Sequence, residues 1–188
     1  TILIGVLFVL ANLQKEYQLN LKQTFLFSTF AWIAIAAFGS LPFVLSSLDF
    51  SFSDAFFESM SGITTTGSTV ITNLDDSPKS ILLWRAIMQW LGGVGIIVMA
   101  ITVLPLLKVG GMQLFKIESS DKPEKILPRT TQVASIIIST YLILTFACAF
   151  FYWISGMGTF DSIAHSMTTI ATGGFSTHNE SIGYFKNP

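Results

Sequence analysis

Charged residues are scarce in this chain, since Lys, Arg, Asp and Glu together make up 11% of its 188 residues. The net charge is −1, and the basic residues flank apolar stretches without forming a patch, so nucleic acid is not an expected partner. The single cysteine, Cys148, cannot form a disulfide within the chain and is expected to pack in an apolar helix. A disulfide-stabilised scaffold is therefore excluded.

Apolar residues are abundant instead: 51% of the chain is hydrophobic and the mean hydropathy is +0.64. Three stretches carry no charge, residues 23–48, 86–107 and 130–160. Each is longer than the ~20 residues that cross ~30 Å of hydrocarbon as a helix. The sequence therefore predicts an all-α membrane protein with three spans.

The N-terminal stretch, residues 1–14, is also uncharged but is too short to span a membrane fully. A signal peptide is disfavoured, because there is no basic n-region and no small-residue cleavage site before Lys15. We expect residues 1–22 to be the end of a preceding transmembrane helix followed by a cytoplasmic loop.

Two segments of the chain repeat one another without a gap, residues 54–69 and residues 161–176, at an offset of 107. Six of the sixteen positions are identical, where chance would give roughly one. The chain therefore contains an internal repeat, placed between apolar runs. The identical pairs are Asp54 with Asp161, Ser59 with Ser166, Met60 with Met167, Ile63 with Ile170, Thr65 with Thr172, and Gly67 with Gly174.

The repeat predicts tandem units, each made of a helix, a re-entrant pore loop and a second helix. The first unit covers residues 23–107, with an outer helix at about 23–47, a short helix at 52–63 followed by a descending strand, and an inner helix at 81–107. Residues 131–188 supply an outer helix and a pore loop for a second unit, whose inner helix is missing. Those two elements are expected at about 131–155 and 160–171.

Residues 108–130 between the two units are polar and are expected to form a cytoplasmic linker, in which Pro123 and Pro128 break any long helix. If both repeated segments face one side, seven of the ten basic residues fall on the other side. By the positive-inside rule that side is cytoplasmic, and the repeated segments open outward. The seven are Lys15, Lys22, Lys108, Lys116, Lys122, Lys125 and Arg129.

Each short helix leads into a segment rich in threonine and glycine, which we call the first Thr/Gly segment (residues 64–68, Thr-Thr-Thr-Gly-Ser) and the second (residues 171–175, Ala-Thr-Gly-Gly-Phe). Non-helical backbone at membrane depth must be buried in protein or line a watery path. Glycine allows dihedral angles that turn successive carbonyl oxygens toward one axis, where they can replace the water shell of a monovalent cation. Asp54 and Asp161 are expected to cap the two short helices. A single such segment would be taken for a turn between helices, but two matched copies favour an ion path.

These segments, together with Trp-Leu-Gly-Gly at residues 90–93 of the inner helix, resemble the Trk/Ktr/HKT superfamily of cation transporters and, within it, the bacterial TrkH-type potassium uptake subunits. The resemblance implies four tandem pore-loop repeats, of which only about one and a half are present, so this chain would be a fragment that cannot close a ring alone. It implies a selectivity filter lined by Thr64, Thr65, Thr66, Gly67, Ala171, Thr172, Gly173 and Gly174. Potassium would bind to the backbone carbonyls of Thr65, Thr66, Thr172 and Gly173.

The resemblance also implies location in the bacterial inner (plasma) membrane, a homodimer in the lipid bilayer, and a cytosolic nucleotide-binding regulatory subunit. No glycine-rich nucleotide-binding motif occurs in this chain.

Several residues outside the Thr/Gly segments allow two interpretations. Gly92, Gly93 and Gly95 are candidate hinge residues for gating, although close packing against a short helix explains them equally well. Arg85 is expected to snorkel to the headgroups or to pair with Asp75 or Asp76. In the repeat His165 takes the place of Glu58. It is a candidate for tuning the pore mouth, but a solvated or packed side chain is expected.

His178 and Glu180 supply too few ligands for a metal site.

Potassium transport is the leading function, on the grounds of the two Thr/Gly segments and the resemblance. A secondary transporter of another small solute would need intramembrane carboxylates for a coupling ion, and the predicted spans contain none. A less selective monovalent cation channel is the other alternative. An intramembrane enzyme would need a nucleophile, base or metal at membrane depth, and no such constellation occurs, so an enzyme is not predicted.

Overall fold

The computed structural model describes residue 10, residues 20–107 and residues 126–185. Apart from residue 10, the expected helix end at residues 1–14 lies outside this part of the chain, as does most of the expected linker at residues 108–130. The described residues form helices, which confirms the predicted fold class. They form no strand, so the descending strand expected after residue 63 is wrong, and residues 64–78 are irregular backbone and turns. The helices are α2 (Leu21–Gly39), α3 (Leu41–Val44), α4 (Phe52–Ile63), α5 (Lys79–Leu107), α7 (Ile126–Ile154), α8 (Thr159–Ile170) and the 3-10 helix η1 (Ser181–Tyr184).

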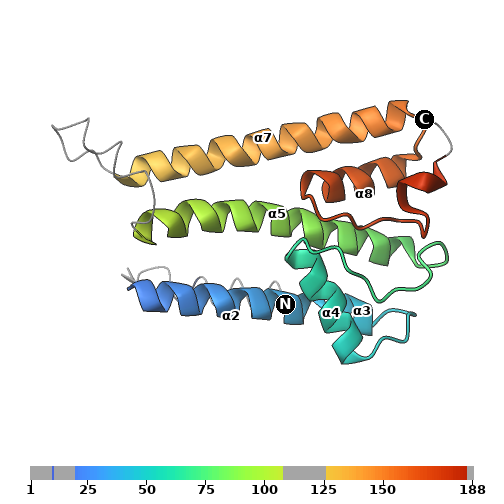
Figure 1. The fold of residues 1–188 in the computed structure, drawn as a ribbon, viewed down its shortest axis with the longest axis horizontal. Coiled ribbons are helices and arrows are strands. Elements are labelled where there is room, and N and C mark those ends of the chain that lie inside the picture. Colours follow the sequence, from blue (N-terminus) through green and yellow to red (C-terminus); the bar gives the residue numbers. More distant parts are fainter. Residues whose placement is uncertain (1–9, 11–19, 108–125, 186–188) are drawn as a thin grey trace.

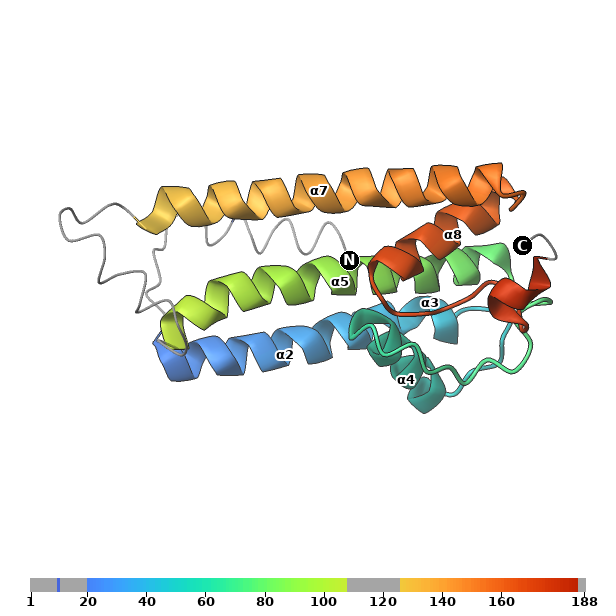
Figure 2. The same ribbon diagram turned by 45° about the horizontal axis from the view of Figure 1, so that its top comes forward.

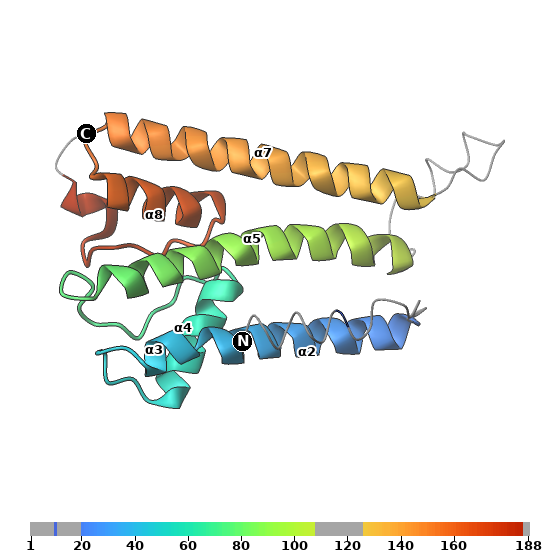
Figure 3. The same cartoon turned by 180° about the vertical axis from the view of Figure 1, so that it is seen from behind.

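Three long helices, α2, α5 and α7, lie side by side, with α5 between the other two (Figures 1 and 3). All three are long and apolar enough to cross a membrane. In the span of α5, 44% of the residues are buried, against 17% in the span that contains α2 and 11% in that of α7, so α5 is the central helix. The outer helices expose large apolar side chains such as Phe27 and Phe146, as contact with lipid requires.

The two short helices, α4 and α8, lie at the same end of this bundle (Figures 1 and 2). Helix α4 packs against α2 and α5, and α8 packs against α5 and α7. We call α4 and α8 the pore helices. Because each is followed by a Thr/Gly segment that returns along α5, the central helix supports both segments.

Two helix boundaries differ from the sequence prediction, and proline explains both. The outer helix expected at 23–47 is divided at Ser40 into α2 and α3, because Pro42 has no N–H to continue the ladder. In contrast, Pro128 does not end a helix as expected. It lies in the first turn of α7, where the missing N–H would have had no helical partner.

The predicted caps are also corrected. Ser51 is the N-cap of α4, and its hydroxyl accepts a hydrogen bond from the Asp54 N–H at 3.2 Å and donates one to the Asp54 carboxylate at 2.6 Å. Asp54 therefore sits in the first turn, where a negative charge suits the helix dipole, without being the cap. In α8 the N-cap is Gly158 and no side chain caps the helix, and the Asp161 carboxylate accepts a hydrogen bond from Thr177 at 2.7 Å instead.

Candidate functional site

Both Thr/Gly segments begin with the same backbone turn. At the end of each pore helix, the first residue past the cap donates its N–H three residues back and the next residue donates five residues back, which is the Schellman arrangement. The four hydrogen bonds are Thr65 to Gly62 (3.0 Å) and Thr66 to Ser61 (3.0 Å) in the first repeat, and Thr172 to Thr169 (2.9 Å) and Gly173 to Thr168 (3.0 Å) in the second. The turn therefore repeats at the offset of 107 found in the sequence.

The backbone angles repeat in the same way. Thr65 and Thr172 have φ of 57° and 56°, and Gly67 and Gly174 have φ of 79° and 78°. Left-handed backbone is costly for a β-branched residue, by roughly 1–2 kcal/mol. Strain of this kind persists where the surrounding structure demands it, and it concentrates at functional sites.

The two Thr/Gly segments also touch one another. A Cβ added at Gly67 would come within 1.9 Å of the carbonyl oxygen of Gly173, so the backbones of the two repeats meet here without room for a side chain. At Gly174 an added Cβ would meet nothing within 4 Å, and only its backbone angle favours glycine. The two glycines thus share a conformation but not an environment.

The ends of both pore helices pack closely against one face of α5, at two adjacent glycines whose lack of a side chain allows the approach. A Cβ at Gly92 would lie 2.0 Å from the carbonyl oxygen of Ile63, the last residue of α4. A Cβ at Gly93 would lie 2.6 Å from the Tyr141 hydroxyl and 3.1 Å from Cα of Ala171. Close packing therefore accounts for both residues, and the hinge stays a prediction, as it does for Gly95 with its ordinary 3.5 Å contact.

Gln89 precedes Gly92 and Gly93 by about one helical turn, lies on the same face of α5 and is fully buried. Its side-chain oxygen accepts a hydrogen bond from the N–H of Phe175 at 3.1 Å, and its amide group lies directly against Gly173. The sequence alone predicted no role for Gln89 beyond its place at the outer end of the inner helix. Its signal was the spacing of Arg85, Gln89 and the glycine pair, which places all of them on one helix face.

Arg85 does not snorkel and does not pair with Asp75 or Asp76, so that prediction is wrong. Its side chain is 1% exposed, and its Nε donates to Oε1 of Glu58 at 2.6 Å. Glu58 is fully buried in the first pore helix and also accepts hydrogen bonds from the Thr69 hydroxyl (2.9 Å) and the Val70 N–H (3.0 Å). Burial favours this pairing, because an unpaired arginine in an apolar span is costly and requires an acceptor.

His165 is the counterpart of Glu58 and is packed rather than solvated, with 3% exposure. Its Nδ1 lies 3.0 Å from the Asp161 carbonyl oxygen and its Nε2 lies 3.1 Å from the hydroxyl of Ser176. Because a carbonyl only accepts, Nδ1 carries the proton of the neutral ring and Nε2 accepts from Ser176. Thr69 and Ser176 are also related by the offset of 107, so each pore helix is hydrogen-bonded to the hydroxyl of the residue that follows its Thr/Gly segment.

Burial lowers the pKa of His165, and the nearby His178 acts in the same direction, while the Asp161 backbone and carboxylate act against it. His165 lies on a pore helix, outside the three spans. The unfolded chain therefore binds a proton more readily than the folded one below the usual pKa of about 6.5, and stability is lost as pH falls through that value. We expect the melting temperature in detergent to decrease between pH 7.5 and pH 5, and the decrease to be smaller in His165→Gln. Equal slopes in the two proteins would contradict the buried neutral histidine.

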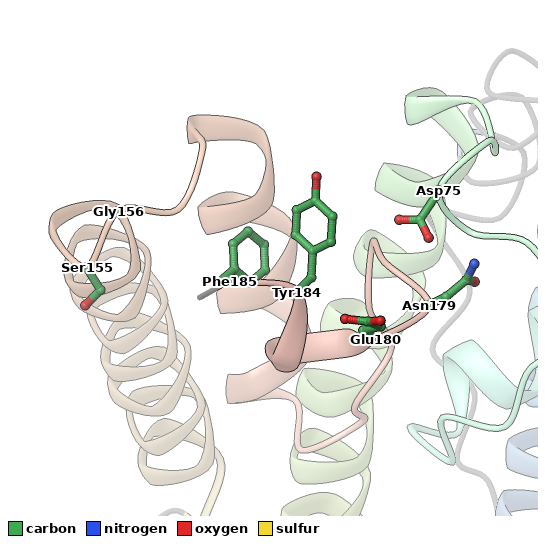
Figure 4. Close-up of a pocket in the computed structure, with 7 residues that line it drawn as sticks. All are labelled: Asp75, Ser155, Gly156, Asn179, Glu180, Tyr184 and Phe185. Atoms are coloured by element: carbon green, nitrogen blue, oxygen red, sulfur yellow. The ribbon is translucent and has the colours of Figure 1, made fainter. Parts of the chain in front are cut away.

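Beyond the Thr/Gly segments, the loops of the two repeats meet at the end of the bundle. His178 lies with Nδ1 2.6 Å from the Asp75 carboxylate and stacks on Tyr184 at 3.6 Å, so it faces Asp75 and not Glu180. The Leu74 N–H donates to the side chain of Asn179 at 2.8 Å. A pocket opens here between the end of α7 and both loops (Figure 4), lined by Asp75, Ser155, Gly156, Asn179, Glu180, Tyr184 and Phe185.

The fold and this site define a class: an α-helical membrane protein in which pore helices and non-helical segments re-enter the bundle between spanning helices. The family model for the cation transport protein TrkH matches residues 1–188, the whole chain. The chain belongs to the TrkH family of cation transport proteins. Family membership and the apolar helices make it a multi-pass protein of the bacterial inner membrane.

Named relatives agree with the family. The Trk system potassium uptake protein TrkH of Escherichia coli (strain K12) is 45% identical over 188 residues, which cover 98% of this chain and 39% of the relative. The Trk system potassium uptake protein TrkG of the same organism is 41% identical over 173 residues, covering 90% and 36%. The crystal structure of the potassium transporter TrkH from Vibrio parahaemolyticus matches with a TM-score of 0.77 and 45% identity over 91% of this chain and 34% of that one. The chain therefore spans well under half the length of these relatives.

Proposed function

We propose that this chain lines part of a potassium-selective pore. The backbone carbonyls of Thr65, Thr66, Thr172 and Gly173 would replace the water shell of the ion there. The observation that carries the proposal is the repeated backbone: the same turn and the same positive φ angles occur in both Thr/Gly segments. Positive φ at every second residue allows successive carbonyl oxygens to face one side of the chain.

The electrostatics of the site favour a cation. Each pore helix ends at its Thr/Gly segment, so the carbonyl-rich, negative end of its dipole points toward the place where the ion would sit. An anion site would instead need N–H groups or an unpaired basic side chain. Arg85 is close by, but Glu58 neutralises it.

A secondary transporter for another solute is less well supported. Such a protein would place carboxylates at membrane depth to bind a coupling ion. The buried carboxylate in the described part of the spans and pore helices is that of Glu58, and its oxygens already accept hydrogen bonds from Arg85, Thr69 and Val70. A less selective monovalent cation channel would use the same geometry, and the ion-flux experiment below distinguishes it from a potassium-selective pore.

The proposal extends to partners by family membership. The relatives are named as Trk system potassium uptake proteins. We propose a homodimer in the bilayer that works with a cytosolic nucleotide-binding regulatory subunit. We also propose that residues 23–107 form one complete pore-loop unit, that the cytoplasmic linker starts at residue 108 and ends where α7 begins at Ile126, and that the residues from Ile126 onward form part of a second unit.

The function is tested by ion flux through a polypeptide of the relatives' full length, reconstituted in proteoliposomes. We expect uptake of potassium and rubidium to exceed that of sodium and lithium by at least about tenfold, a preference worth about 1.4 kcal/mol. Equal fluxes of all four ions would support the unselective channel instead. Flux that requires a second solute or a coupling gradient would support the secondary transporter.

A further inference from the structure

Arg85 is a buried charge whose partners come from both repeats. It lies in α5, the inner helix of the first repeat, and its side chain is 1% exposed. A buried ion pair is rarely the most stable solution, because apolar residues of similar volume often pack at least as well. One guanidinium nitrogen, Nη2, even lacks a hydrogen-bond partner within the described residues. Stability alone therefore does not explain the pair, and its geometry has to be considered.

On the side of the first repeat, Arg85 reaches the backbone beyond the first Thr/Gly segment through Glu58. Nε donates to Glu58 at 2.6 Å, and the same carboxylate accepts hydrogen bonds from the Thr69 hydroxyl and the Val70 N–H. Thr69 directly follows the first Thr/Gly segment. Arg85 thus holds the far end of that segment against α5.

On the side of the second repeat, Arg85 acts directly. Its Nη1 donates to the carbonyl oxygen of Ser176 at 3.1 Å, and its guanidinium carbon lies 4.0 Å from the ring centroid of Phe175. Phe175 is the last residue of the second Thr/Gly segment and Ser176 follows it. Since Thr69 and Ser176 are equivalent in the repeat, a single side chain is tied to the same position of both segments.

We propose that Arg85 is a positioning residue that fixes the relative height of the two Thr/Gly segments, with Glu58 as its anchor in the first repeat. This inference rests on the proposed function, because relative height matters only if both segments contribute carbonyls to one ion path. Arginine suits this role because its rigid, planar fork can bind two acceptors while its face lies on an aromatic ring. Lysine would keep the charge but not this combination.

The test uses two variants of Arg85, neither of which leaves a buried charge without a partner of opposite charge. Arg85→Lys keeps a positive charge beside Glu58 but loses the fork and the stacking. The double variant Glu58→Leu with Arg85→Met removes both charges together, so that no buried charge is left unpaired. Trp84→Phe is the matched control: it removes a 2.9 Å hydrogen bond from the neighbouring residue of α5 to the carbonyl of Gly39, which touches neither Thr/Gly segment.

Potassium and sodium fluxes and the melting temperature in detergent are measured for each variant in a polypeptide of the relatives' full length. We expect both Arg85 variants to remain folded and to lose about tenfold of the preference for potassium over sodium. Trp84→Phe should lower the melting temperature while leaving the preference unchanged. The double variant decides the question if Arg85→Lys does not fold.

Gly174→Ser, measured in the same assay, separates this inference from the proposed function. If Gly174→Ser loses selectivity while both Arg85 variants keep it, the positioning role is wrong and the filter stands. If Gly174→Ser also keeps full selectivity, the filter itself is wrong and the positioning role falls with it. Loss of selectivity in Trp84→Phe would overturn the positioning role too, because loosening of any contact of α5 would then suffice.

Discussion

Replacing Gly67 by serine should abolish most of the preference for potassium and should also destabilise the protein. The backbone at this position is left-handed, and serine, which has a Cβ, adopts that conformation at a cost of about 1–2 kcal/mol. The new Cβ would also overlap the Gly173 carbonyl oxygen, 1.9 Å away, and crowding of this kind adds about 1–3 kcal/mol. Because Gly173 belongs to the second Thr/Gly segment, one substitution displaces carbonyls of both repeats. The measurement is the potassium to sodium flux ratio together with the melting temperature.

The comparison with Gly174→Ser sharpens this prediction. Gly174 has the same backbone angle but open space around it, so its substitution should lower selectivity about tenfold while destabilising the protein less than Gly67→Ser. Gly183→Ser is the control, because Gly183 lies in η1 with nothing within 4 Å of an added Cβ and no positive φ. If Gly67→Ser and Gly174→Ser both fold and keep full selectivity, the two segments are buried turns.

Gly173→Ser is not a neutral control, although the repeat alignment alone suggests one. Its added Cβ would lie 2.4 Å from the side-chain carbon of Gln89, which is fully buried and holds the Phe175 N–H. The alignment orders the glycines correctly by backbone angle, since only Gly174 of the pair has positive φ. It carries no information about which side chain of α5 lies against them.

Replacing Gly92 by alanine should destabilise the protein and stop transport. Helix propensity alone predicts the opposite, a gain of about 1 kcal/mol for alanine over glycine inside a helix. The contact decides, because the new Cβ would lie 2.0 Å from the Ile63 carbonyl oxygen and 2.7 Å from its carbon, so the end of α4 and the first Thr/Gly segment must move. We expect a loss of about 1–3 kcal/mol, measured as a lower melting temperature, and loss of potassium uptake.

Gly95→Ala is the matched control on the same helix. Its nearest contact is a Trp32 ring carbon at 3.5 Å, which is ordinary van der Waals distance, so the substitution should be tolerated. If Gly92 acted mainly as a hinge, alanine would stabilise the helix at both positions and reduce only the opening of the pore. Higher melting temperatures in both variants would therefore contradict the packing account.

The local features of this fold could be predicted from the sequence because each rests on a pattern of neighbouring residues. The uncharged stretches located the three spans, and the repeat at an offset of 107 predicted two matched segments. The structure shows that the match extends to the positive φ angles of Thr65 and Thr172, which the sequence analysis did not predict. The division of the outer helix at Ser40 was also encoded locally, since Pro42 lies two residues further on.

The contacts between distant elements could not be predicted in this way. Glu58 and Arg85 are separated by 27 residues, and Arg85 and Ser176 by 91, so no local periodicity links them. A lone arginine in an apolar span indicates a buried partner, but Asp75 and Asp76 were nearer in sequence than Glu58. The repeat held the better clue, because Glu58 aligns with His165 and Thr69 aligns with Ser176. Within the first repeat Glu58 is hydrogen-bonded to Thr69, and within the second His165 is hydrogen-bonded to Ser176.

The central claim is that carbonyl oxygens of the two Thr/Gly segments bind the transported ion together. It is tested most directly by a crystal structure of the full-length protein grown in rubidium, with the ion located by its anomalous scattering. We predict an anomalous peak in contact with the carbonyl oxygens of Thr65, Thr66, Thr172 and Gly173. A protein that transports rubidium but shows its bound ion elsewhere, with no peak between these four carbonyls, would contradict the account.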